Sequence, residues 1–87
     1  MASEAMNKRL NRKGALRTAR SDTTNMINYS ETLRRLEVEF KNGGVYHYLE
    51  VEPEKWEEYR DWVISGNSSG WFVNKKIKGF YDEEHIK

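Results

Sequence analysis

The chain has 87 residues, a net charge of +1 and no cysteine. A chain of this length forms one domain, and without cysteine neither a disulfide nor a thiolate metal site can stabilise it. No apolar run has the length of a membrane span and no secretory signal pattern is present, so we expect a cytoplasmic protein that depends on packing of its aromatic residues, 13% of the chain.

The N-terminal part of the chain is basic. Residues 1–20 carry six Lys or Arg residues against Glu4 alone, a net charge of +5, whereas the other residues carry nine basic and thirteen acidic side chains, a net charge of −4. Large apolar residues are few at this end and follow no sustained period. We therefore expect residues 1–22 to be a disordered basic arm and residues 23–87 to be the folded domain.

Three segments after the arm have the pattern of antiparallel strands. Residues 24–30 combine β-branched and aromatic residues and precede a polar turn. Residues 33–40 alternate between apolar side chains for a core and charged side chains for a solvated face. Asn42-Gly43, a strong hairpin signal, then leads into a third strand over residues 45–51.

The hairpin between the second and third strands has two possible registers. A two-residue turn would put Tyr46 and Tyr48 on the solvated face. A three-residue loop with Gly43 in the left-handed conformation would bury both tyrosines and expose His47. We favour the three-residue loop, because it buries two large rings and leaves the imidazole in water.

Two helices are expected after the strands. Pro53 suits the first position of a helix, and the glutamates around it complement the helix dipole. Trp56, Tyr59 and Val63 form the apolar stripe of this helix, with Trp62 at its edge, and a glycine ends it.

Ser68 or Ser69 begins a second, shorter helix that extends through Lys78, and residues 80–87 form a tail. Three side chains of this helix are expected to face inward: Phe72, Val73 and Ile77. The predicted fold class is therefore α+β, a three-stranded antiparallel meander with two C-terminal helices packed on one face.

The order of these elements, together with several motif residues, resembles the KTSC domain. The resemblance covers residues 22–86. The matching residues are Tyr46, Tyr48, Ser68, Gly70, Phe72, Asn74, Ile77 and Tyr81. The family is named for the C-terminus of some lysyl-tRNA synthetases and also occurs as small bacterial and phage proteins. The resemblance implies a domain of unknown function for which RNA binding is suggested by the synthetase context, and we expect the motif residues from Tyr46 to Ile77 to be structural.

No arrangement of residues predicts a reaction. Residues 66–70 match the G-x-S-x-G pattern of a nucleophile elbow, but a helix precedes the serine where the mechanism needs a strand. Glu83, Glu84 and His85 are adjacent, and adjacent residues seldom converge on one metal ion. We expect a protein that is not an enzyme and holds no metal or cofactor.

Two groups of residues have the chemistry of a nucleic-acid surface. In the basic arm, cations that could contact phosphate are Arg12, Lys13, Arg17 and Arg20. Near the second helix, an indole and a phenol accompany three ammonium groups: Trp71, Lys75, Lys76, Lys78 and Tyr81. These groups predict a small non-catalytic, monomeric module that binds RNA or another single-stranded nucleic acid. The alternative is a protein-interaction module, such as a bacterial or phage regulator that docks on a larger protein machine, since tryptophan is a favoured interface anchor.

Overall fold

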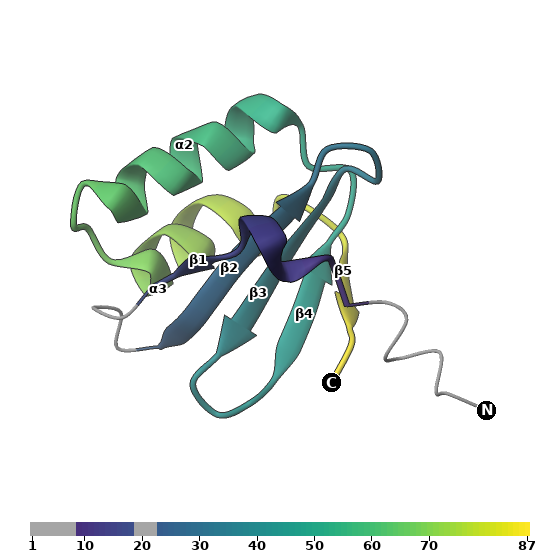
Figure 1. Cartoon of the computed structure of the whole chain (residues 1–87), viewed down its shortest axis with the longest axis horizontal. Coiled ribbons are helices and arrows are strands. Elements are labelled where there is room, and N and C mark those ends of the chain that lie inside the picture. Colours follow the sequence, from purple (N-terminus) through teal and green to yellow (C-terminus); the bar gives the residue numbers. More distant parts are fainter. Residues whose placement is uncertain (1–8, 19–22) are drawn as a thin grey trace.

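The computed structural model describes residues 9–18 and 23–87 of the chain. Its sheet has five antiparallel strands that follow one another in chain order, with helices on one face (Figure 1). The strands are β1 (Leu16–Arg17), β2 (Thr24–Ser30), β3 (Arg35–Phe40), β4 (Val45–Tyr48) and β5 (Glu83–His85). The predicted α+β class and central meander are confirmed, but the number of strands is corrected from three to five. The two edge strands have two and three residues, too few to show a period.

The helical face is covered by α2 (Pro53–Ile64), α3 (Ser69–Phe72) and η2 (Val73–Ile77). Helix α2 begins at Pro53, as predicted. Ser68 precedes α3, and its Oγ accepts a hydrogen bond from the backbone N–H of Trp71 at 3.1 Å. The second helix is thus capped as expected, but its last part is a π-helical turn that ends at Ile77, one residue earlier than predicted.

The hydrophobic core lies between the sheet and these helices. Tyr59 of α2 stacks on Phe72 of α3 with ring centroids 4.4 Å apart. Val73 and Ile77 are fully buried beside them, so the predicted inward face of the second helix is confirmed. The buried side chains that complete the core from the strand side are Ile27, Leu36, Val38, Tyr48 and Val51.

The three-residue loop is the one that the hairpin adopts. Gly43 has a φ of +94°, and the N–H of Phe40 donates to the carbonyl of Gly44 at 2.8 Å. Tyr46 therefore lies opposite Val38, and the next tyrosine of the strand faces the core. A glycine is needed at the left-handed position, because a side chain there would be strained.

The other face of the sheet is not solvated, which corrects two of the predictions. Glu37 and His47 have no exposed surface, although both were expected in water. Residues 9–17 cover them: Leu10 is 7% exposed, η1 (Arg12–Gly14) follows, and β1 pairs with β2. The predicted disorder is therefore wrong for residues 9–18, while residues 1–8 and 19–22, which include Arg20, lie outside the described residues. The segment is held by two apolar side chains, Leu10 and Leu16, by ion pairs and by the pairing of β1 with β2, which a search for apolar periodicity does not detect.

Candidate nucleic-acid interface

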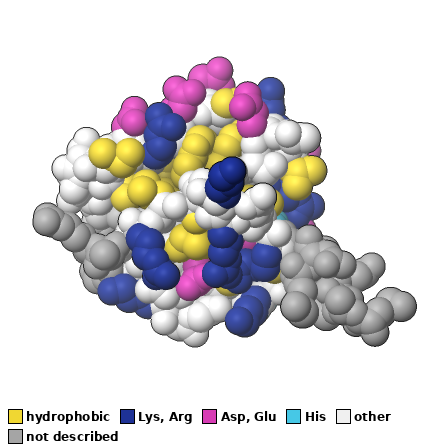
Figure 2. Space-filling view, in the orientation of Figure 1, with side chains coloured by type: hydrophobic (Ala, Val, Ile, Leu, Met, Phe, Trp, Pro, Cys, Tyr) yellow, Lys and Arg dark blue, Asp and Glu magenta, His cyan; other side chains and the backbone are white. Residues whose placement is uncertain are grey.

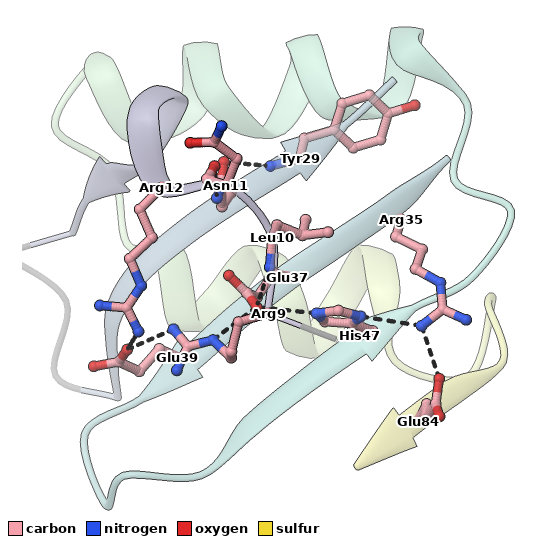
Figure 3. Close-up of polar contacts among 11 residues, drawn as sticks. Arg9, Leu10, Asn11, Arg12, Tyr29, Arg35, Glu37, Glu39, His47 and Glu84 are labelled. Atoms are coloured by element: carbon pink, nitrogen blue, oxygen red, sulfur yellow. Dashed lines mark hydrogen bonds and ion pairs between the residues drawn. The ribbon is translucent and has the colours of Figure 1, made fainter. Parts of the chain in front are cut away.

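A buried carboxylate anchors the basic segment to the sheet (Figure 3). Glu37 points from β3 to the face opposite the core, because side chains alternate along a strand. Its Oε2 accepts hydrogen bonds from Arg9 Nε at 2.9 Å and from the backbone N–H of Leu10 at 3.2 Å. His47 Nε2 lies 3.0 Å from the same oxygen. One carboxylate oxygen thus joins the N-terminal segment to two neighbouring strands.

The hydrogen bonds of His47 define its tautomer. Its Nδ1 lies 3.1 Å from Nη1 of Arg35. Because a guanidinium group can only donate, Nδ1 must accept, and the ring proton is on Nε2, which donates to Glu37. The same Arg35 nitrogen donates to Oε1 of Glu84 on β5 at 2.8 Å (Figure 3). The network therefore connects residues 9–10 with β3, β4 and β5.

Burial alone would raise the pKa of Glu37, but hydrogen bonds from His47 and the Leu10 amide and the charge of Arg9 lower it below the ordinary value of 4.5. A carboxyl group whose pKa is lower in the folded state stabilises the fold above its unfolded pKa, and this contribution is lost as the pH falls through the folded pKa. We expect the free energy of unfolding to decrease as the pH falls below about 4.5. Urea unfolding of the natural protein and of Glu37→Gln between neutral and acid pH measures this, and a parallel decrease in both proteins would contradict it.

Three of the predicted phosphate-binding residues remain exposed on the segment that the network holds. Arg9 is used in ion pairs with Glu37 and Glu39. Arg12 is weakly paired: its Nη2 lies 3.9 Å from Oε1 of Glu39, and 58% of its side chain is exposed. Lys13 and Arg17 have no acidic partner among the described residues. Figure 2 shows Lys and Arg side chains gathered on this face, away from the acidic side chains along α2. We call Arg12, Lys13 and Arg17 the basic face.

The second predicted group is not brought together. Trp71 stacks on Trp62 near the end of α2, with ring centroids 4.9 Å apart. The Tyr81 hydroxyl donates to Glu52, which precedes the start of α2, at 2.8 Å. The ten residues between these two contacts correspond to about 15 Å of helix. The group also lies on the helical side of the sheet, opposite the basic face. Of its three exposed lysines (Lys75, Lys76 and Lys78), Lys76 is 4.0 Å from Glu58.

Lys78 instead belongs to a cavity of about 470 Å³ between the hairpin and η2. Its Nζ lies 5.2 Å from the centre of the Phe40 ring, which meets the Tyr46 ring edge to face at 5.8 Å. The lining residues are Thr23, Phe40, Lys41, Asn42, Tyr46, Tyr48, Asn74, Lys78 and Glu83. Three of them belong to the predicted family motif and one to the predicted nucleic-acid site. Sequence reasoning missed the other five, because nothing in the local pattern relates positions from separate segments.

The remaining motif residues lie in the supporting structure. Ser68 caps α3, and Phe72 and Ile77 are in the core. Gly70 lies against Thr23, where a Cβ atom would overlap the threonine hydroxyl. These positions build the helical layer that forms one wall of the cavity.

The fold and the cavity define a small α+β domain with a helical layer on one face of an antiparallel sheet. The chain belongs to the KTSC domain family, whose model matches residues 20–81. The crystal structure of a KTSC domain protein from Yersinia pestis is similar, with 31% sequence identity and a TM-score of 0.63, over 77% of this chain and 89% of that chain. A search of curated proteins found no match. Among the described residues, no helix combines the length and apolar character required to cross a bilayer.

Proposed function

We propose that this protein is a small non-catalytic module that binds single-stranded nucleic acid, RNA in the first place, through its basic face. The observation that supports the proposal most directly is that the N-terminal cations differ in their contacts and exposure. Folding uses Arg9 to hold the segment in place and leaves Arg12, Lys13 and Arg17 exposed on η1 and β1. Cations on an ordered segment suit a phosphate backbone, because the segment does not have to become ordered when the strand binds.

The hairpin end of the sheet carries a further cation, Lys41. Thr18, which follows β1, hydrogen-bonds to Thr24 through the two hydroxyl groups at 2.7 Å. The N–H of Lys41, at the tip of the hairpin, donates to the carbonyl of Thr23 at 2.9 Å. Lys41 also lines the cavity with Lys78. The acidic side chains of α2 would repel phosphate, and a bound strand is therefore expected to follow the hairpin end.

The salt dependence of binding tests this proposal. For a single strand, log affinity falls with log salt with a slope of about −0.7 per phosphate contact. Replacing Arg12, Lys13 and Arg17 together by glutamine should therefore weaken binding of a short single-stranded RNA and make the slope shallower by about 2. Fluorescence anisotropy across a salt series measures both quantities.

A matched control replaces Lys55, Arg60 and Lys75 by glutamine, which changes the net charge equally at exposed or half-exposed helical positions. The control should keep the slope of the natural protein. Absence of RNA binding at low salt, or equal losses in the two triple variants, would overturn the proposal.

Protein binding is a second candidate function, and it is favoured by one observation. Trp71 is 43% exposed on top of Trp62, and Ile64, two residues further along α2, is 64% exposed. Exposed indole and aliphatic groups are typical anchors of protein interfaces. A partner that is retained after nuclease treatment and lost in Trp71→Ala would favour this function over RNA binding.

A further inference from the structure

Residues 9–14 cross the outer face of the sheet, the face opposite the core, and we call them the strap (Figure 3). Residues 11–14 of the strap are exposed, and Leu10 is its one buried side chain. Among the described residues, the core between the sheet and the helices contains no side chain from the strap, although Leu16, which follows the strap, packs against this core. The core can therefore persist when the strap is released from the sheet.

The polar contacts of the strap converge on three side chains of the outer face. Two of these are Glu37 and Glu39 of β3, which pair with Arg9 at 2.9 and 3.3 Å. The third is Asn28 of β2, whose Nδ2 donates to the carbonyl of Asn11 at 2.9 Å. Because water can also bond to each of these groups, releasing the strap leaves none of them without a hydrogen-bond partner.

The closed strap leaves one buried atom without a hydrogen bond. Oε1 of Glu37 has no partner among the described residues, although the side chain has no exposed surface. An unpaired buried carboxylate oxygen is unfavourable, since it has lost its water without compensation. When the strap opens, water can reach this oxygen, and His47 still hydrogen-bonds to Oε2. Opening therefore recovers part of the free energy that is lost with the Arg9 ion pair.

A pivot follows directly after η1. Gly14 is exposed, and a Cβ atom at this position would meet nothing within 4 Å. Ala15, the next residue, has an extended backbone with a φ of −67° and a ψ of 143°. Beyond it, Leu16 and Arg17 pair with β2, so β1 holds one end of the strap at the sheet. Small residues beside a paired strand allow the strap to turn without disturbing the sheet.

We propose that the strap opens and closes as one unit over the folded domain, and that binding of nucleic acid holds it closed. The second part deepens the proposed function and rests on it, because Arg12 and Lys13 are on the strap whereas Arg17 is on β1. A strand that contacts all three residues binds the closed form more tightly, since an open strap must first be ordered. The strap thereby regulates the basic face.

Amide hydrogen exchange of the full chain, measured at increasing urea concentration, tests the opening. The amide of Leu10, which donates to Glu37, reports on the strap. Its exchange should depend little on urea, because release of a few residues exposes little surface. The amides of β3 and β4 should exchange only through global unfolding and depend strongly on urea. Equal free energies of exchange and equal urea slopes would show that the strap opens only when the domain unfolds, which would overturn the inference.

Addition of a short single-stranded RNA tests the coupling. If the RNA binds only the closed form, exchange of the Leu10 amide should slow by about a hundredfold at an RNA concentration of about a hundred times Kd. Unchanged exchange, with binding that still depends on Arg12, Lys13 and Arg17, would overturn the coupling and leave the proposed function intact. Absence of RNA binding would remove both the proposed function and the coupling, and exchange measured without RNA would still decide whether the strap opens.

A double variant separates the strap from the domain. Arg9→Gln with Leu10→Ala removes two ion pairs and the buried leucine side chain and changes no residue of the sheet or helices. In amide spectra, residues 9–14 should take the shifts of an unstructured chain, while the helices and β2 to β5 keep their dispersion. Lys13→Gln with Gly14→Ala, which changes the net charge equally at exposed strap positions, should leave the strap closed. Loss of dispersion throughout the first variant, or an open strap in both variants, would contradict the inference.

Discussion

Replacing Glu37 by alanine should lower the free energy of unfolding by about 3–5 kcal/mol, the usual cost of removing one partner from a buried ion pair. The carboxylate has no exposed surface, and it accepts hydrogen bonds from Arg9, Leu10 and His47. Its loss leaves the buried Leu10 amide and the His47 imidazole N–H without an acceptor, and Arg9 keeps only Glu39. Urea unfolding followed by tryptophan fluorescence measures the change.

Glu39→Ala is the control for this variant. Glu39 is on the same strand and the same face, two residues away, and it also pairs with Arg9, but its side chain is 25% exposed. Pairs that reach solvent contribute little, so the control should lose about 1 kcal/mol or less. If Glu37→Ala does not fold, Glu37→Gln keeps the side-chain volume and should still lose more than Glu39→Ala. Equal losses at the two positions would show that Glu37 is not the anchor.

The anchor also has a consequence for binding. The basic face is ordered by residues 9–10, whose polar contacts converge on Glu37. In a Glu37 variant that still folds, the segment that carries Arg12 and Lys13 would lose the contacts of Arg9 and Leu10 with Glu37, whereas Arg17 would stay paired in β1. RNA affinity should then fall although no phosphate-binding residue has changed, because part of the binding free energy is used to order the segment.

Gly70→Ala should destabilise the protein by about 1–3 kcal/mol, the usual cost of adding a methyl group to a closely packed site. Gly70 is buried in α3, and a Cβ atom there would overlap Thr23 Oγ1 and lie 3.2 Å from Thr23 Cβ. Rotation of the threonine can move its hydroxyl away but leaves its Cβ 3.2 Å from the new methyl group, so the helix or the threonine must shift. Thermal unfolding measures the loss.

A double variant locates the cause. Thr23→Ala removes the overlapping hydroxyl, so the combination with Gly70→Ala should cost less than the sum of the two single variants. Gly14→Ala is the matched control, since a Cβ at Gly14 meets nothing within 4 Å. It should leave stability unchanged or raise it by up to about 1 kcal/mol. Full stability of Gly70→Ala would show that the helix can move away from the threonine.

Local patterns predicted the central elements well. β2 covers the predicted residues 24–30, and α2 begins at the predicted proline. The three-residue loop follows from the conformation that Gly43 can adopt, and it determines which side of the sheet Tyr48 faces. Each of these features depends on residues close together in the sequence. The short edge strands β1 and β5 depend instead on distant residues, because only pairing with β2 and β4 orders them.

The candidate sites were predicted only in part. Arg12, Lys13 and Arg17 were identified by charge alone, but the segment that carries them is attached to the sheet through a carboxylate at least twenty residues away. The group around Trp71 was predicted as one surface, yet its members contact opposite ends of α2. The cavity escaped detection as a site, since the five segments that line it meet only in the folded protein.

By itself the sequence determined the central hairpin, the start of α2 at Pro53, the serine cap of α3 and the side of the sheet on which the core forms, because turn geometry and the alternation of side chains act over a few residues. Only the tertiary structure decided whether the opposite side of the sheet is covered or exposed to water. Whether Glu37 and His47 meet water or a covering segment depends on the free energy of bringing Arg9 and Leu10 back across the sheet, and no local pattern carries that quantity.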